Sequence, residues 1–500
     1  MIEYRSIPAD YKSTGVRKYD GNPYIEALPR LEKTKDEILD RIACYPPEFT
    51  NTDRKKGELV RIAELSRIGS LIYPFAEYRH AATNATINLR EAYICRNPVH
   101  PSGQQRRTMI AALKDLNDED ALRALAFKST ALGQLIMAVS GSGKTTLGGA
   151  MLAPYCHVIE HTRYRGQPLR CRQVPVIPLS VMYDGSLLGL CMQFFQTVDR
   201  ILGNTHYARE ARALRTIPQM VLLLIRVATA IGLALIFVDD LQNLRAARGK
   251  LAEMVLNLFS QILEIAGVSM IYSATPALEP VIAQSLRNTR KLSSGGTSKF
   301  PVMKRDDVQW IDLATTLWRY QLVKHPGELT PTVLDAWHAC SGGNPAFTSM
   351  SFALAQRQEI GDGETLSPVS FERVAETDLI LLKPAIKALL SGKESALLKF
   401  DDLIPKSGLM ELLDQLGWAR EEDASAEADP REFPELQDTV VDSSKPASLP
   451  AKGRGRTVAK AKARSTAKSK AKGGTKKSVP RATKFALQKA PALPSVRPAI

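Results

Sequence analysis

A glycine-rich segment between an apolar run and a stretch of small residues has the composition of a phosphate-binding loop. It reads Ala138-Val-Ser-Gly-Ser-Gly-Lys-Thr-Thr146, and it lies between Leu135–Met137 and Leu147–Met151. This order predicts a strand, a loop and a helix whose first backbone N–H groups face the phosphates. The predicted nucleotide-binding residues are Ser140, Gly141, Ser142, Gly143, Lys144, Thr145 and Thr146.

Two side chains of this loop are expected to act on the nucleotide directly. Lys144 would reach the β- and γ-phosphates, and the hydroxyl of Thr145 would coordinate Mg²⁺. The motif has Ala138 where its first glycine usually stands. We expect the loop to tolerate this departure, because Gly141 and Gly143, nearer the phosphates, are kept. A glycine-rich turn without a ligand is the alternative, and the flanking strand and helix argue against it.

A second motif, which is acidic, follows the glycine-rich loop by about 90 residues. There the apolar run Leu233–Val238 ends in Asp239 and Asp240. An apolar strand that ends in acidic residues is typical of a Walker B motif. Asp239 would hold Mg²⁺ through water, opposite Thr145. Asp240 stands where glutamate usually activates the attacking water, so we expect slow hydrolysis. The two motifs together predict an ATPase with ATP and Mg²⁺ as cofactors; a strand end with a capping aspartate is the alternative.

A third apolar run, Gly267–Tyr272, is followed by Ser273-Ala-Thr-Pro276. A polar side chain at the end of a strand beside the Walker strands could sense the γ-phosphate. Thr275 is the first choice and Ser273 the second. The alternative is simple turn formation before the proline.

The positive charge of the chain is concentrated at its end. Residues 444–500 contain 16 Lys and Arg and no Asp or Glu, so this segment carries a charge of +16. The net charge of the whole chain is +15, and residues 1–443 therefore carry 15 − 16 = −1. This Lys/Ala/Ser/Pro sequence predicts a disordered tail that binds DNA phosphates non-specifically. A solvated tail that aids solubility is the alternative. The segment before the tail, 414–443, is predicted to be an acidic linker.

The cysteines and the apolar runs bear on the compartment. Six scattered cysteines without a CxxC pair are typical of reduced thiols in a cytoplasmic protein. Cys156, His157, His161 and Cys171 lie near one another in the sequence but match no standard zinc spacing. Residues 1–18 lack the apolar core of a signal peptide. The long apolar run 217–238 contains an arginine and ends in the Walker B acids, so we expect a buried helix and strand, not a membrane span.

The elements that position these motifs follow from the periodicity of apolar residues. Residues 1–130 predict a helical region, with helices at Lys35–Ile42, Gly57–Phe75, Ile87–Ile94 and Met109–Leu125. Residues 131–313 predict an ATPase core. Its further strands are Val174–Leu179 and Val308–Leu313, and its further helices are Leu187–Leu202, Pro218–Ile231 and Leu278–Leu286. Residues 314–413 predict a helical lid with a break at Ser341–Pro345.

Strands that alternate with helices predict an α/β fold, a parallel five-stranded sheet flanked by helices. The order of strands, acidic motif, sensor and helical lid is similar to that of AAA+ P-loop ATPases. In AAA+ rings, an arginine of one subunit reaches the γ-phosphate held by its neighbour. Arg290 and Arg287 are the candidates for this catalytic role, with Arg305 as the weaker one. Solvated surface arginines are the alternative for each.

Several segments outside the Walker motifs make the resemblance more specific. From about residue 20 to residue 405 the chain resembles the TnsC proteins, TniB-related AAA+ regulators of Tn7-like transposons. The segments that carry the resemblance are Asn22–Pro29, Ala92–Pro98, Val139–Thr146, Val158–Tyr164, Tyr183–Ser186, Leu190–Phe195, Asp239–Gln242, Cys340–Pro345 and Lys399–Pro405.

The resemblance implies an ATP-dependent, DNA-associated regulator of transposition. It would assemble as a ring or filament on double-stranded DNA and link a TniQ/TnsD-type target selector to a TnsA/TnsB-type transposase. Three other functions remain open. They are a replication-initiator or clamp-loader ATPase, a DNA-compacting protein with an inactive nucleotide fold, and a signalling NTPase, although no internal repeat supports the last.

Overall fold

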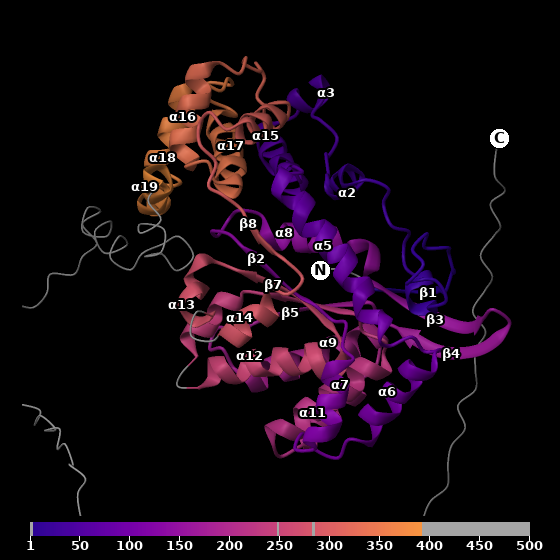
Figure 1. Ribbon diagram of the computed structural model, residues 1–500. Coiled ribbons are helices and arrows are strands. Elements are labelled where there is room, and N and C mark those ends of the chain that lie inside the picture. Colours follow the sequence, from indigo (N-terminus) through magenta and orange to yellow (C-terminus); the bar gives the residue numbers. More distant parts are fainter. Residues whose placement is uncertain (1–3, 248–249, 283–285, 393–500) are drawn as a thin grey trace, which may run out of the picture. The chain divides into compact units, whose positions relative to one another are not determined.

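Figure 1 shows the computed structural model of the chain, which describes residues 4–247, 250–282 and 286–392. The predicted acidic linker 414–443, the basic tail 444–500, the motif Lys399–Pro405 and the end of the predicted lid lie outside the described residues.

A parallel five-stranded sheet forms the centre of the fold, and this confirms the predicted α/β class. All four strand pairs are parallel, and the spatial order is β5 (Val176–Ser180), β6 (Leu235–Asp239), β7 (Ser269–Ala274), β2 (Gly133–Met137) and β8 (Thr297–Lys299). Parallel strands end at the same edge of a sheet, so the segments that follow β2, β5, β6 and β7 meet there.

Helices cover both faces of this sheet because its residues are apolar on both sides. Ile136, Phe237 and Ile271 pack in one cluster, which includes α5 (Ala76–Ile94) and α8 (Lys144–Leu152). Their neighbours along each strand pack in a second cluster with α9 (Leu187–Leu202), α11 (Ile217–Ala230) and α12 (Leu251–Gln261). The alternation along the strands therefore divides the core into two layers.

The prediction of a fifth strand at Val308–Leu313 is wrong. These residues begin helix α15 (Val308–Trp318), and the fifth strand is the short β8. The side chain of Asp307 accepts a hydrogen bond from the backbone N–H of Gln309 and so caps α15. Trp310, Leu313 and Leu317 are buried at helical spacing. β8 is polar and lies at the sheet edge, so its sequence carries little strand signal.

The helices predicted before the core are partly confirmed. Lys35–Ile42 is α2, and Ile87–Ile94 is the end of the 19-residue α5. The segment Gly57–Phe75 is not one helix. It contains α4 (Glu58–Glu64) and a 3₁₀ helix (Leu65–Ser70). Its apolar residues Leu65, Ile68 and Leu71 are three positions apart, which fits the 3₁₀ part, because residues i and i+3 eclipse in such a helix.

The segment Met109–Leu125 is also divided. It contributes to α6 (Pro101–Ala112) and α7 (Glu119–Phe127), because Asp118 caps a new helix. Helix α1 (Pro23–Glu26) and helix α3 (Asn51–Arg54) complete this part of the chain.

A second, three-stranded sheet lies beside the core and orders β1 (Arg5–Pro8), β3 (His157–Tyr164) and β4 (Gln167–Gln173). It contains His157, His161 and Cys171, three of the residues considered as metal ligands, and Cys156 directly precedes β3. No group of His, Cys, Asp or Glu able to hold a metal occurs among the described residues. His161 is instead buried, with its ring nitrogens 2.9 Å from the hydroxyl of Tyr11 and 2.8 Å from Oε1 of Gln173.

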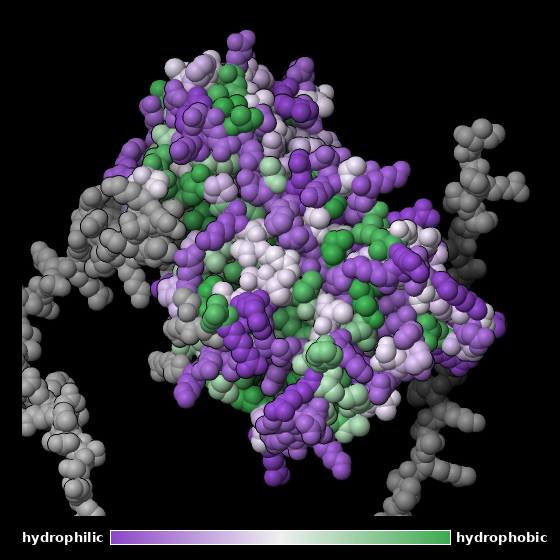
Figure 2. All heavy atoms as spheres, in the orientation of Figure 1, coloured by the Kyte–Doolittle hydropathy of each residue, from purple (hydrophilic) through white to green (hydrophobic). Residues whose placement is uncertain are grey.

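The remaining core helices follow the expected order approximately. α10 (His206–Ala213) follows α9. The predicted helix Leu278–Leu286 overlaps α13 (Glu279–Ile282) and the first residue of α14 (Leu286–Leu292), and its residues 283–285 lie outside the described part of the chain. No described helix is long and apolar enough to cross a membrane. Figure 2 shows hydrophilic side chains over most of the face in view, with smaller hydrophobic groups between them.

The region predicted as the lid contains α16 (Pro331–Ser341), α17 (Pro345–Glu359), α18 (Pro368–Glu376) and α19 (Lys383–Ser391), and Figure 1 shows them packed as a bundle. Helix α15 crosses the boundary predicted at residue 314. The break predicted at Ser341–Pro345 is confirmed, because α16 ends at Ser341 and α17 begins at Pro345. Trp337 stacks between Phe352 and Phe371, with ring centroids 5.2 and 5.1 Å away.

A buried ion pair joins the lid to the N-terminal region. The guanidinium of Arg61 donates 2.7 Å hydrogen bonds to both carboxylate oxygens of Glu364. This bonding, opposed by burial, holds the pKa of Glu364 well below its usual value. Because the folded-state pKa is lowered, the pair stabilises the fold above the unfolded pKa of about 4.3, and the contribution is lost as pH falls.

Replacing Arg61 by methionine should lower the free energy of unfolding by about 3 kcal/mol at pH 7, because a buried carboxylate loses its principal partner. Urea denaturation measures the change. The control is Arg123→Met, which breaks an exposed pair with Glu119 and should cost less than about 1 kcal/mol. The difference between wild type and Arg61→Met should shrink below about pH 4. Equal effects of the two substitutions would contradict the role of this pair.

Candidate nucleotide-binding site

The glycine-rich loop connects the end of β2 to the start of α8 and approaches two other elements closely. Gly141 and Gly143 have φ angles of 79° and 88°, which residues with a side chain rarely adopt. A Cβ atom would lie 2.5 Å from Oδ1 of Asn344 at Gly141, and 2.2 Å from the Tyr78 hydroxyl at Gly143. Both glycines are therefore required by conformation and by space.

Ala138, the departure from the motif, fits the loop without strain. It is not among the described non-glycine residues with positive φ, and its backbone N–H donates to the carbonyl oxygen of Ala274, 3.1 Å away. The buried Lys144 extends along the loop and donates to the carbonyl oxygens of Ala138 and Val139 at 2.8 and 3.0 Å. The lysine charge is thus held within the loop that a nucleotide phosphate would enter.

The ends of β6 and α8 bring the two expected magnesium ligands together. The hydroxyl of Thr145 donates to Oδ2 of Asp239 at 2.7 Å. These residues are 94 positions apart in the sequence, and the parallel sheet places them at one edge. A hydroxyl and a carboxylate oxygen form a set of hard oxygen donors suited to Mg²⁺.

Asp240 adopts a left-handed conformation with φ 56°, which an aspartate tolerates better than most residues. Its Oδ2 accepts a hydrogen bond from the hydroxyl of Ser180 at 3.0 Å, and its Oδ1 accepts one from Nε2 of Gln242 at 3.1 Å. The Asp240 carboxylate is therefore oriented by the end of β5 and by the 3₁₀ helix after β6 (Leu241–Ala246). Sequence reasoning did not identify Ser180 or Gln242 as its partners.

The end of β7 contributes Thr275, which lines the same pocket as the loop. Its hydroxyl and that of Ser273 are buried and have no hydrogen-bond partner among the described residues. A buried hydroxyl without a partner costs free energy, so one that faces a pocket suits an oxygen-rich ligand. Thr275 lines the pocket, whereas Ser273 is not among its lining residues, so the geometry favours the first choice.

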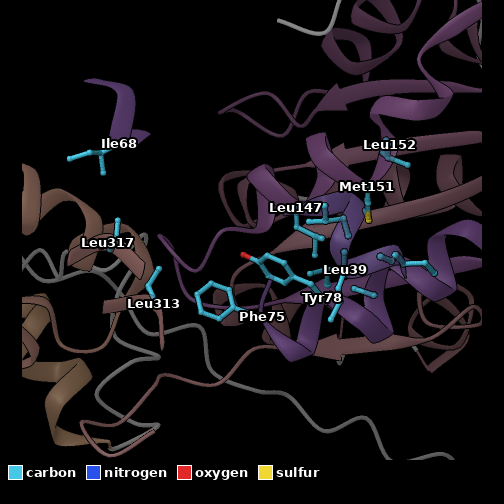
Figure 3. Close-up of a cluster of buried hydrophobic side chains, with 14 of the residues drawn as sticks. Leu39, Ile68, Phe75, Tyr78, Leu147, Met151, Leu152, Leu313 and Leu317 are labelled. Carbon is cyan, nitrogen blue, oxygen red and sulfur yellow. The ribbon is translucent and has the colours of Figure 1, made fainter. Parts of the chain in front are cut away.

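The pocket has a volume of about 550 Å³ and a wall that sequence reasoning missed. Ile68, Ile72, Tyr73 and Phe75, before α5, line it together with Leu313 of α15. Figure 3 shows Phe75 and Tyr78 among the apolar side chains between α8 and Leu313 of α15. An apolar and aromatic wall beside a phosphate loop suits a nucleotide base. The apolar stretch from Leu71 to Phe75 was the available signal.

Arg287 and Arg290 lie on α14, and both are exposed and absent from the lining of this pocket. The structure of one chain therefore does not bring them to the site. Arg305 forms an ion pair in the lid, because its Nε donates to Oδ1 of Asp335 at 2.7 Å.

The residues present fit Mg²⁺–ATP. The loop, Lys144 and the start of α8 would hold the phosphates, Thr145 and Asp239 would hold the metal, and the apolar wall would hold the base. Bound Mg²⁺ would supply charge neutralisation at the phosphates. Asp240 is placed at the carboxyl edge with its acceptor oxygens oriented, as a residue that positions water must be.

No family model and no curated protein matches the chain. Solved structures resemble it at low identity. The Walker-type ATPase PABY2304 of Pyrococcus abyssi is 14% identical, with 63% of this chain and 92% of that chain covered and a TM-score of 0.34. The ORC1 protein of Aeropyrum pernix in complex with DNA is 14% identical, with 62% of this chain and 87% of that chain covered and a TM-score of 0.34. AMPPCP-bound DnaA of Aquifex aeolicus is 12% identical, with 60% of this chain and 85% of that chain covered and a TM-score of 0.30.

Replacing Asp240 by asparagine should keep ATP affinity within about threefold and slow hydrolysis about a hundredfold, because the shape remains but a charged acceptor for the proton of water is lost. Steady-state phosphate release and nucleotide titration measure the two quantities. Asp10→Asn makes the same chemical change at an exposed position and should alter neither. Hydrolysis at the wild-type rate in Asp240→Asn would exclude this role for Asp240.

Proposed function

We propose that the chain is an ATPase whose nucleotide state controls its assembly on double-stranded DNA. The observation that carries the ATPase proposal is the contact between Thr145 and Asp239, which joins the ends of the two Walker motifs at 2.7 Å. Ser140–Thr146 bind the nucleotide in this proposal, and Thr145 and Asp239 bind Mg²⁺. Asp240 and Thr275 act in hydrolysis.

A direct connection between the loop and the lid supports control by the nucleotide. Nδ2 of Asn344 donates to the carbonyl oxygen of Ser140 at 2.8 Å, and the N–H of Ala346 donates to that of Gly141 at 3.0 Å. Both donors belong to the start of α17. A nucleotide that orders the loop would therefore also restrain the lid, which gives ATP a physical route to the surfaces of the lid.

We further propose that the protein regulates DNA transposition, linking a TniQ/TnsD-type target selector to a TnsA/TnsB-type transposase in the cytoplasm. The resemblance of nine sequence segments to TnsC proteins supports this part of the proposal. A replication-initiator or clamp-loader function shares the ATP chemistry. The two functions differ in whether addition of the transposase changes ATP turnover on DNA.

The proposal predicts that Lys144→Ala abolishes ATP-dependent association with DNA. The lysine charge meets the phosphates in a partly enclosed site, where its interaction is stronger than in water. Fluorescence anisotropy of a labelled duplex, with and without ATP and Mg²⁺, measures association with the full chain. The matched control is Lys55→Ala, since this residue lies after α3 and outside the pocket.

Two results would contradict the proposal. ATP affinity that is unchanged in Lys144→Ala would exclude the loop as the nucleotide site. DNA association by the wild type that does not depend on ATP would leave the ATPase in place but exclude nucleotide control of assembly.

Arg290, or Arg287, is proposed to reach the nucleotide of a neighbouring subunit. Such a residue needs a rigid cation with forked donors. Arg290→Ala should keep nucleotide affinity in the monomer within about threefold and lower hydrolysis on DNA about a thousandfold, the magnitude typical of such arginines. Mixing with Lys144→Ala should partly restore turnover, because each variant lacks a different half of a shared site.

The mixing experiment has an internal control. Arg290→Lys keeps the charge without the forked donors and should remain impaired. If both single variants are folded and their mixture shows no turnover above their sum, for Arg290 and for Arg287, the site is not shared through α14.

A further inference from the structure

A second polar pocket lies at the opposite edge of the central sheet from the nucleotide site. It has a volume of about 240 Å³, and Arg96, Arg106 and Arg107 line it together with Tyr24 and Gly232. Gly232 precedes β6, whereas Asp239 ends this strand. Because each strand residue advances about 3.3 Å, the two sites are separated by the length of the strand.

Arg96 is buried, with 8% of its surface exposed, and is incompletely satisfied. Its Nε donates to the carbonyl oxygen of Ala92 at 2.9 Å, and its guanidinium lies 5.2 Å from the centre of the Tyr93 ring. Its Nη2 is buried and has no hydrogen-bond partner in the part of the chain that the structure describes. A buried N–H group without a partner costs free energy, which an acceptor beside this guanidinium would recover.

Arg106, with 3% exposed, is fixed by three carbonyl oxygens. Nη1 donates to Leu125 at 2.6 Å, and Nη2 donates to Glu264 and Ile265 at 2.8 and 2.7 Å. These acceptors belong to helix ends, whose partial negative charge offsets some of the arginine charge. Nε has no partner among the described residues. Arg106 is therefore a rigid positive wall of the pocket.

The charge of this pocket is not neutralised by acidic side chains. Within residues 4–247, 250–282 and 286–392, neither Arg96, Arg106 nor Arg107 forms an ion pair, and no carboxylate lines the pocket. Burial lowers the pKa of Arg96 and of Arg106, and the charge of Arg96 acts in the same direction on Arg106. Buried charges without a counter-charge are costly, so the pocket favours an anion.

We propose that this pocket binds a phosphate group through Arg96 and the exposed Arg107, with Arg106 behind them. Arginine presents planar, forked donors that match the oxygens of a phosphate. The volume is far larger than the roughly 30 Å³ share of one water molecule in the liquid. The phosphate comes either from a free phosphate compound or from the DNA backbone. The site goes beyond the proposed function, since it requires neither ATP hydrolysis nor assembly.

The first experiment titrates inorganic phosphate into the full chain saturated with Mg²⁺–ADP, which keeps the nucleotide loop occupied. Calorimetry should show that Arg107→Gln and Arg96→Lys each weaken phosphate binding at least tenfold. Arg96→Lys keeps the positive charge, so the fold should persist, but lysine lacks the forked pair of N–H donors that a guanidinium presents to a phosphate. The control is Arg123→Gln on the neighbouring α7, an exposed arginine outside the pocket, which should bind like the wild type.

The second experiment measures duplex DNA affinity against salt for the same four proteins. A DNA phosphate in the pocket predicts that the slope of log affinity against log salt falls by about one in Arg107→Gln. It also predicts lower affinity in Arg96→Lys at every salt concentration. An effect in the first experiment alone identifies a free phosphate compound, and an effect in the second identifies DNA. Equal phosphate affinities, or no binding, together with equal DNA curves in all four proteins would overturn the proposal.

Discussion

Hydrogen bonds to the glycine-rich loop from α5 on one side and from the start of α17 on the other are the constraint on which the rest of the site depends. Tyr78 of α5 donates to the carbonyl oxygen of Ser142 at 3.3 Å, while Asn344 and Ala346 of α17 donate to those of Ser140 and Gly141. These bonds use carbonyl oxygens of the loop, so they do not compete with phosphate oxygens for its backbone N–H groups. The N-terminal helix, the core and the lid therefore meet at one short segment.

The sequence was sufficient for four of the five strands of the sheet, β2, β5, β6 and β7, and for the residues that follow them at its carboxyl edge. Spacing alone placed Lys144 and Thr145 after one buried strand and Asp239 after another, because the Walker motifs are local patterns with fixed neighbours. Prediction from the sequence failed for β8, because this strand is short and polar. It also failed for α15, because the apolar residues in a short window fit a strand as well as a helix. Periodicity in so few residues does not separate the two.

The parts of the site that come from distant segments could not be predicted from the sequence. Phe75 and Leu313 are more than 200 positions apart and line one pocket, and Asn344 reaches the loop from the lid. The hydrogen bond from Ser180 that orients Asp240 could not be predicted either, because β5 and β6 are neighbours only in the folded sheet. Arg96 and Arg106 show their unpaired charge only once burial is known. Long-range packing, which local propensity does not encode, decides all of these contacts.

The ATP affinity of Asn344→Ser tests the central claim, that the lid helps to hold the nucleotide loop, most directly. Serine keeps the cap of α17 but is too short to reach the carbonyl oxygen of Ser140, so only the bridge is lost. The account predicts a folded protein that binds a non-hydrolysable ATP analogue about tenfold more weakly, the effect of roughly 1.4 kcal/mol from one lost buried hydrogen bond. Wild-type affinity in this variant would show that the loop binds nucleotide without the lid, and would contradict the account.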